Sequence, residues 1–431
     1  MKNKLHDIIT SKQKGLAVGV PSFCTANYYA IKAILSYAKI NNVEVLIEAT
    51  ANQVNQYGGY TGMKPADFAC FVTDIAKEIG CPAELIILGG DHLGPLTWTD
   101  LDEEEAMPEA EELVRQFVEA GFTKIHLDTS MKLKSDPVNE PLDTRVIAER
   151  GASLMQVCQD AYKTRKSLYP DSVKPVFIIG SEVPIPGGAQ EEESVSVTDP
   201  EDLIKTYDTY CEVFKEHGLE ESLSDVIAIV TQPGVEFSDH GVVEYDRELA
   251  KPLMSTAKKM QNIVLEGHST DYQPKMALKQ MVEDGVGILK VGPALTFAIR
   301  AGLFALSAIE QELICPEKSS DFKQVLIDLM NAKPENWKKY YFGDPEEIEI
   351  KKKYSYSDRV RYYLSDASVT EAINTLFNNL DNTTIPLGLL HQYMPEQYYK
   401  VKNNELEFKA EALVMDFVNP FIEEYFFAAG V

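Results

Sequence analysis

The sequence predicts an α/β protein built on a (β/α)8 barrel with a helical C-terminal extension. Short apolar segments rich in β-branched residues recur through the first 300 residues, and a longer amphipathic segment follows each of them. Eight such units over about 300 residues match a (β/α)8 barrel, whose usual size is ~250 residues before insertions. The structural alternative is an open doubly wound sheet, but no Gly-x-Gly-x-x-Gly sequence follows the first predicted strand to support it.

The predicted strands are short, and many of them end in a glycine, a hydroxyl or a charged residue. They cover residues 16–23, 43–48, 84–89, 124–128, 176–180, 226–230, 263–266 and 288–291. Between them, segments such as 30–40, 66–79, 110–120 and 277–284 repeat apolar residues at i, i+3, i+4 and i+7, the period of a helix. We therefore expect residues 1–300 to form the barrel.

The chain changes character after residue 300. Longer helical patterns cover 301–313, 320–331, 369–380 and 405–428, and aromatic segments that contain proline separate them. These patterns predict that residues 301–431 form a helical extension packed on the barrel.

Composition excludes several classes of function. The 431 residues are 45% hydrophobic and carry a net charge of −26, which would repel nucleic acid or an anionic membrane surface. The six cysteines form no CxxC pair and are typical of reduced thiols. No signal peptide is recognisable, and no run approaches the ~20 apolar residues of a membrane span. We expect a cytoplasmic protein that binds neither nucleic acid nor membrane.

The residues that follow the predicted strands indicate a metal site. In a (β/α)8 barrel the functional side chains lie at the carboxyl ends of the strands. His92, Glu182 and His268 follow three different strands, and together they would offer two nitrogens and one carboxylate to a divalent cation with an open coordination position. A single histidine or glutamate at a strand end is more often structural, but the combination at three strand ends favours a metal.

Other strand-end residues are candidates for moving protons. Asp91, Glu48 and Asp128 are the acid–base candidates, and the two-residue period of a strand places His126 on the same face as Asp128. Lys290, in the eighth predicted strand, is the alternative of a Schiff-base amine, but pairing with a carboxylate explains it more simply.

Polar side chains near the same ends are candidates for contacting a substrate. Lys132 suits an anionic group, and glycines and hydroxyls cluster at 58–62, 269–270 and 292–296, where exposed backbone N–H groups could hold a phosphate. No P-loop is present for a nucleotide. The predicted substrate-binding residues are Asn27, Gln53, Ser130, Lys132, Ser269, Thr270 and Lys290.

Several longer motifs make the sequence resemble one family over nearly its whole length. It is similar to the GatZ/KbaZ family, described as the accessory, non-catalytic subunit of class II tagatose-bisphosphate aldolase. Two of the motifs lie in the C-terminal extension, so the resemblance is not to the barrel alone. The motifs are Val20-Pro21-Ser22-Phe23-Cys24-Thr25-Ala26-Asn27, Glu48-Ala49-Thr50-Ala51-Asn52-Gln53-Val54-Asn55-Gln56, Gly58-Gly59-Tyr60-Thr61-Gly62-Met63, Gly89-Gly90-Asp91-His92-Leu93-Gly94-Pro95, Gly180-Ser181-Glu182-Val183-Pro184, Gln232-Pro233-Gly234-Val235-Glu236-Phe237, Glu266-Gly267-His268-Ser269-Thr270, Arg361-Tyr362-Tyr363 and Gln392-Tyr393-Met394-Pro395.

The family is in turn similar to class II aldolases, zinc-dependent barrels that cleave ketose bisphosphates through a metal-stabilised enediolate. The resemblance implies that Asp91 exchanges the proton of the C4 hydroxyl and that His92 and His268 bind the metal. Glu182 resembles the glutamate that those enzymes place before a Gly-Gly loop. The implied cofactor is a divalent metal, with Zn²⁺ first and Mn²⁺, Ni²⁺ or Co²⁺ as alternatives.

The resemblance to class II aldolases is incomplete. Their sixth strand supplies a further zinc histidine, where this chain has Gln232, and Gly292 stands where they tend to have asparagine. This departure implies a weaker or altered metal site, which fits an accessory subunit.

Two functions follow from the resemblance. In the first, the chain supports a separate catalytic class II aldolase subunit. In the second, it is itself a metal-dependent ketose 4-epimerase, which cleaves and re-forms the C3–C4 bond of a ketose or ketose phosphate by retro-aldol and aldol steps. The sequence slightly favours the accessory subunit, and a homo-oligomer is also possible.

Overall fold

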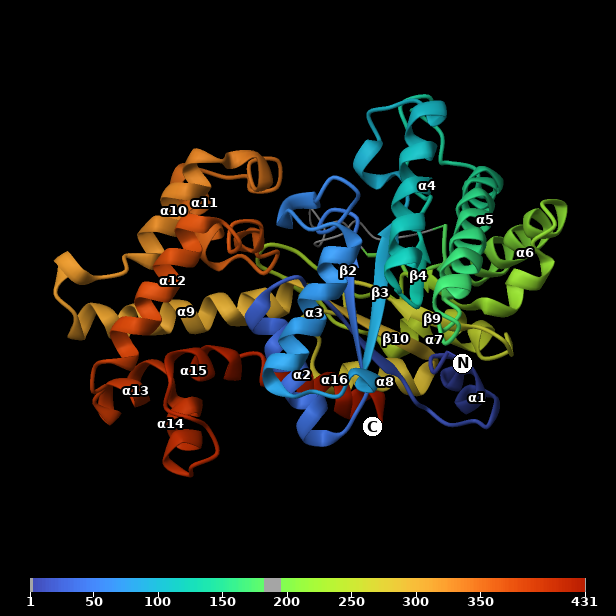
Figure 1. Ribbon diagram of the computed structural model, residues 1–431. Coiled ribbons are helices and arrows are strands. Elements are labelled where there is room, and N and C mark those ends of the chain that lie inside the picture. The colour runs from blue at the N-terminus through green and yellow to red at the C-terminus, as the bar shows by residue number, and fades with distance from the viewer. Residues whose placement is uncertain (1–2, 182–194, 431) are drawn as a thin grey trace.

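The computed structural model describes residues 3–181 and 195–430, and it contains a closed barrel of eight parallel strands (Figure 1). The predicted fold class and all eight predicted strands are confirmed, although the first strand begins at Val20 rather than at residue 16. The barrel closes where β1 pairs with both β2 and β10. Its strands are β1 (Val20–Cys24), β2 (Val45–Thr50), β3 (Ile86–Leu93), β4 (Lys124–Leu127), β5 (Val176–Ile179), β6 (Val226–Thr231), β9 (Val264–Gly267) and β10 (Val286–Val291).

A helix follows each of these strands. Local sequence sets their ends: the Asn27 side chain accepts the N–H of Ala30 and caps the first of them, and Gly80 ends the second in the left-handed conformation. The helices that follow the first seven strands are α2 (Tyr28–Asn41), α3 (Pro65–Ile79), α4 (Glu103–Ala120), α5 (Thr144–Leu168), α6 (Pro200–Glu216), α7 (Arg247–Ala257) and α8 (Lys275–Asp284).

The amino end of the barrel is filled with apolar side chains. Helix α1 (His6–Gln13) lies there, and Leu5 and Ile8 pack against inward-facing residues such as Ile178 and Ile288. Because this end is closed by packing, the polar residues inside the barrel gather at the carboxyl ends of the strands.

A small hairpin that the sequence did not predict follows β6. Strands β7 (Glu236–Phe237) and β8 (Val242–Val243) pair antiparallel, and they are too short to give a clear alternating pattern.

The C-terminal helices stand beside the barrel around one long helix, α9 (Figure 1). Three of the four predicted helices are present, but the prediction of one helix over 405–428 is wrong. The helix is interrupted between Asp416 and Asn419, because Pro420 has no N–H to bond to the Asp416 carbonyl in a continuous helix. The helices are α9 (Pro293–Leu313), α10 (Phe322–Ala332), α11 (Pro345–Tyr354), α12 (Ala367–Asp381), α13 (Leu387–Tyr393), α14 (Pro395–Lys402), α15 (Ala410–Asp416) and α16 (Asn419–Ala429).

Helix α16 returns to the barrel and packs on β1 between α2 and α8. Phe426 lies against Phe23 of β1 and stacks on Tyr37 of α2, with ring centroids 6.0 and 4.9 Å away. The barrel and the C-terminal helices share one hydrophobic core, and α9 runs across residue 300. The division of the chain at that residue stays a prediction.

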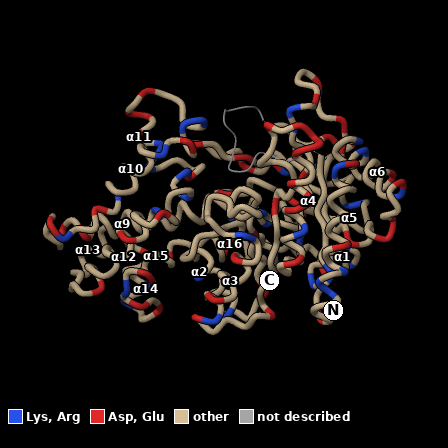
Figure 2. Tube along the Cα trace, turned by 45° about the horizontal axis from the view of Figure 1, so that its top comes forward, with Lys and Arg blue, Asp and Glu red and all other residues tan. Residues whose placement is uncertain are grey.

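Helix α9 corrects the expectation that no segment of the chain approaches the length and apolar character of a membrane span. It is long and apolar enough, by length and composition alone, to cross a membrane. Two features are those of a core helix: 67% of its most apolar window is buried, and its Arg300 forms an internal ion pair with Asp358 at 2.6 Å. Figure 2 shows basic and acidic residues interspersed along the trace of the described chain.

Candidate functional site

A cavity of about 560 Å³ opens at the carboxyl ends of the barrel strands. Residues from the C-terminal helices and their connections supply part of its wall together with the barrel. Strand ends contribute Cys24, Asp91, His92, His268 and Lys290, and the extension contributes Arg361, Tyr362, Leu364, Thr370, Ile373 and Asn374.

Asp91 and His92 are adjacent in sequence, yet both reach this cavity. In a regular strand they would point to opposite faces. The pairing of β3 with β4 shifts register between Gly90 and Leu93, and His92 has the left-handed φ of 48° that is rare outside glycine. This bulge turns both side chains toward the barrel axis.

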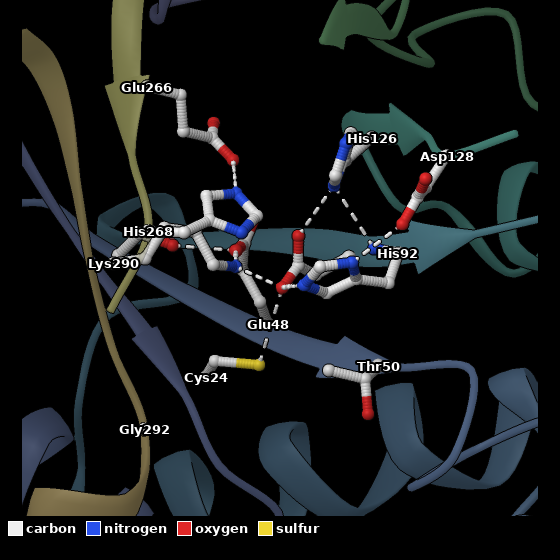
Figure 3. A network of polar contacts seen from close by, with 12 residues as sticks. Cys24, Glu48, Thr50, His92, His126, Asp128, Glu266, His268, Lys290 and Gly292 are labelled. Atoms are coloured by element: carbon white, nitrogen blue, oxygen red, sulfur yellow. Dashed lines mark hydrogen bonds and ion pairs between the residues drawn. The ribbon is translucent and has the colours of Figure 1, made fainter. Parts of the chain in front are cut away.

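Five charged side chains form a buried ion network at the floor of the cavity and beneath it (Figure 3). Lys124 Nζ lies 2.8 Å from Glu48 Oε1 and 2.9 Å from Glu266 Oε2, and none of the three side chains is exposed. Lys290 contacts Glu48 and lies 2.6 Å from Asp91 Oδ2. A Cβ at position 89 would overlap the Glu48 carboxylate, so a larger residue there would displace Glu48 from the network.

Three histidines lie next to this network, and each contacts its own carboxylate (Figure 3). Their ring centroids are 4.9 to 5.3 Å apart. The pairs are His92 Nδ1 with Asp128 Oδ2 at 2.7 Å, His126 Nδ1 with Asp91 Oδ1 at 2.9 Å, and His268 Nε2 with Glu266 Oε1 at 2.9 Å.

Four of these residues could hold a metal ion together. Ligand atoms of Asp91, His126, Glu266 and His268 all lie within 4.8 Å of one another. His126 Nε2 is buried and has no hydrogen-bond partner among residues 3–181 and 195–430. Of the three metal ligands expected from sequence, His268 belongs to this cluster, His92 lies beside it, and Glu182 lies outside the described residues.

The protonation states of these groups follow from burial and from their charged neighbours. Burial opposes ionisation of Asp91, but Lys290 and the neighbouring histidines hold its pKa well below the usual range. Burial lowers the pKa of His268 to about 4, although Glu266 acts in the opposite direction. Burial also opposes the charge on Lys290, but Asp91 and Glu48 raise its pKa well above the usual value. Lys290 is therefore an ammonium in an ion pair, which does not favour a Schiff base.

The acid–base candidates occupy different positions in this arrangement. Asp91 lines the cavity, whereas Glu48 lies in the ion network beneath it. Asp128 accepts hydrogen bonds from both the hydroxyl and the backbone N–H of Ser130 while it contacts His92. The geometry makes Asp128 a group that orients His92, and its predicted role in proton transfer stays a prediction.

The structure separates the predicted substrate-binding residues into two groups. Asn27, Gln53, Ser269 and Lys290 line the cavity. Ser130, Lys132 and Thr270 lie outside its lining: Ser130 binds Asp128, exposed Lys132 binds the carbonyl of Val138, and the Thr270 hydroxyl contacts the Lys290 carbonyl and the Tyr425 hydroxyl.

Sequence reasoning did not assign Lys124 or Glu266 to the site, and it placed His126 only on the face of Asp128. A signal was present: Lys124, His126 and Glu266 are charged or polar residues inside short apolar strands. In a barrel, such residues at inward-facing positions of different strands must pair, because an isolated buried charge is costly.

These features define a class of protein: a parallel (β/α)8 barrel whose carboxyl-end cavity holds carboxylate, imidazole and ammonium groups, as in barrel enzymes. Residues 5–430 match the family model described as D-tagatose-1,6-bisphosphate aldolase subunit GatZ/KbaZ-like. The chain belongs to this family, which confirms the resemblance stated from the sequence.

Two relatives cover nearly the whole chain. The D-tagatose-1,6-bisphosphate aldolase subunit GatZ of Klebsiella pneumoniae subsp. pneumoniae is 43% identical over 422 residues, 98% of each chain. A crystal structure from Sinorhizobium meliloti 1021, described as a probable tagatose 6 phosphate kinase, is 41% identical with a TM-score of 0.86. The match covers 95% of this chain and all of that one, so the relative shares both the barrel and the C-terminal helices.

Proposed function

We propose that this chain is the accessory subunit of a class II tagatose-1,6-bisphosphate aldolase and that it keeps a separate catalytic subunit stable and active. The observation that carries this proposal is the family match over residues 5–430, together with a Klebsiella relative named as an aldolase subunit. Both names favour an aldolase subunit over the ketose 4-epimerase, and both place the chain in carbohydrate metabolism.

The end of β6 also supports an accessory role. The Gln232 side-chain oxygen accepts the backbone N–H groups of Gly234 and Val235 at 2.8 and 3.0 Å. This side chain is used to hold the local turn, and it offers no imidazole to the cavity. The sixth strand therefore does not supply the zinc histidine that the resemblance to class II aldolases would require.

A divalent metal, with Zn²⁺ as the first candidate, fits the buried cluster. Two imidazoles and two carboxylates are a common donor set for Zn²⁺, and one nitrogen of His126, Nε2, has no hydrogen-bond partner among the described residues. The cluster and the adjoining ion network together contain four carboxylates (Glu48, Asp91, Asp128 and Glu266) but only two lysines (Lys124 and Lys290). A bound dication would add positive charge beside these carboxylates, and it would polarise a sugar carbonyl.

The partner proposal is tested by expressing the catalytic aldolase subunit with and without this chain. We expect the two chains to purify together, and we expect the half-life of aldolase activity at a fixed temperature to rise several-fold in the pair. Gel filtration and timed activity assays measure the two effects. Separate elution together with an unchanged half-life would contradict the accessory role.

The metal proposal predicts about one Zn²⁺ per chain after loading and desalting, measured by elemental analysis. His126→Ala and His268→Ala should each lower the metal content at least tenfold, because each removes one of the clustered nitrogen ligands. His217→Ala, outside the cluster at the end of α6, is the matched control and should retain the metal. Equal metal content in all four proteins would show that the cluster is not the site.

We also infer that the chain works in the cytoplasm. All six cysteines are free, and two of them, Cys81 and Cys158, are buried. Reduced thiols of this kind are typical of proteins in a reducing compartment.

A further inference from the structure

The mouth of the cavity carries an arginine that the proposed function does not use. Arg361 lies in the short turn Arg359–Tyr362 of the extension, and it lines the cavity beside Tyr362. Its Nη1 donates to the carbonyl oxygens of Ser357 and Asp358, the latter at 3.0 Å. These bonds orient the guanidinium but leave its charge without an opposite partner.

The lack of a carboxylate partner distinguishes the two arginines of this turn from Arg150 and Arg300, which are buried elsewhere in the described chain. Across residues 3–181 and 195–430, no carboxylate lies within ion-pair distance of Arg361 or of Arg359. By contrast, Arg150 and Arg300 are each 2% exposed, and each binds an aspartate, at 2.7 and 2.6 Å. Arg359 is also buried, and its Nε has no hydrogen-bond partner in the part of the chain that the structure describes. Arg359 is buried and Arg361 is half-buried, and the rings of Tyr340 and Tyr362 lie against them at 3.3 and 4.7 Å. No carboxylate of the described residues neutralises either charge, so the site favours an anion.

The nearby aspartates are already engaged. Asp358 accepts Arg300 Nε and the Thr296 hydroxyl, both at 2.6 Å. Asp271, another residue of the cavity wall, accepts two backbone N–H groups at the start of α9, at 2.8 and 3.0 Å. This helix terminus is therefore occupied by a side chain of the protein, and the positive charge at the cavity mouth belongs to Arg361.

The groups around Arg361 suit a phosphate. Arg361 Nη2 and Arg359 Nη1 both lie 3.4 Å from the Tyr362 hydroxyl, so the two guanidiniums converge on one point. Tyr60 and Thr61, from the segment after β2, also line the cavity, and the ring centroids of Tyr60 and Tyr362 are 4.4 Å apart. Guanidinium and hydroxyl donors together are strong ligands for phosphate oxygens.

We propose that this mouth binds the phosphate group of a sugar phosphate, with Arg361 as its charged anchor. A phosphate monoester carries close to two negative charges at neutral pH. Arg361 lines the cavity and would contact it, and Arg359 adds a second positive charge from behind the lining through its 3.4 Å contact with the Tyr362 hydroxyl. The volume of about 560 Å³ accommodates a hexose phosphate, and the deeper wall offers Asp91, His92 and His268 to the sugar hydroxyls. The inference deepens the proposed function and rests on it, since it names the ligand class of the same aldolase-like cavity.

Isothermal titration of the full-length chain with fructose 6-phosphate, fructose and inorganic phosphate tests this proposal. We expect fructose 6-phosphate to bind at least tenfold more tightly than either of the other two. Arg361→Gln should weaken the binding of fructose 6-phosphate at least tenfold and leave the binding of fructose unchanged. Arg361→Lys should bind fructose 6-phosphate with an affinity between those of the unaltered chain and Arg361→Gln, because it keeps the charge but loses the planar donor pair. Arg145→Gln, a surface variant on α5, is the matched control and should bind like the unaltered chain.

Three results would overturn the proposal: equal affinity for fructose and fructose 6-phosphate, equal affinity for inorganic phosphate and fructose 6-phosphate, or an unchanged affinity in Arg361→Gln. If Arg361→Gln does not fold, the thermal shift of the unaltered chain and of Arg361→Lys with the three probes decides the question. This titration needs no catalytic subunit and the co-purification assay needs no ligand, so failure of one is distinguishable from failure of the other.

Discussion

Replacing Lys124 with methionine is expected to lower the free energy of unfolding by about 3–5 kcal/mol. The Lys124 ammonium is fully buried and lies within 3.0 Å of Glu48 and Glu266. Methionine has a similar length but no charge, so two buried carboxylates lose their shared cation. Urea denaturation followed by circular dichroism measures the change.

Two further variants show whether charge is the cause. Lys251→Met is the matched control, because Lys251 is 67% exposed and its ion pair with Glu248 lies on the surface; the expected change is below about 0.5 kcal/mol. Adding Glu266→Gln to Lys124→Met should recover about 1 kcal/mol or more, because it removes one of the uncompensated charges. A loss below about 1 kcal/mol for Lys124→Met alone would show that the network contributes little to stability.

The second large effect is expected for Gly94→Ala, which should destabilise the protein by about 3 kcal/mol. Gly94 has an extended backbone, so strain in φ is not the cause. A Cβ at this position would overlap the backbone oxygen of Asp128, and a backbone atom cannot rotate away. Asp128 would have to move, together with its hydrogen bond to His92.

Gly388→Ala is the matched control for this variant. Nothing lies within 4 Å of a Cβ built on Gly388, which lies inside α13. Alanine is favoured over glycine in a helix by about 0.8–1 kcal/mol, so this variant should be neutral or more stable. Thermal unfolding of the two variants side by side measures the difference, and equal melting temperatures would contradict the predicted overlap at Gly94.

Much of the fold was predictable because its elements are local. Each strand is a short apolar run, and the strands of a parallel barrel are covered on both faces, so these runs stand out from the amphipathic helices between them. The break at Pro420 was also readable, because proline cannot continue a helix. The packing of α16 on β1 was not, since it joins Phe426 to Phe23 across nearly the whole chain.

The site was predictable in part. Asp91, His92 and His268 line one cavity, as strand-end positions in a barrel indicate. Their pairing was not predictable, because it depends on the bulge in β3 and on which side chains face the axis at the same height. For this reason His126 contacts Asp91 and His92 contacts Asp128, although Asp91 and His92 are the neighbours in sequence.

The sequence by itself determined the barrel, its family and the strand ends that carry the polar chemistry, because these depend on short-range pattern and on motifs. Only the tertiary structure decided which charges neutralise one another inside the barrel and that Arg361 of the extension lines the same cavity as His268 of the barrel. The physical reason is distance: electrostatic pairing and cavity walls depend on separation in space, and residues far apart in sequence meet only after the chain has folded.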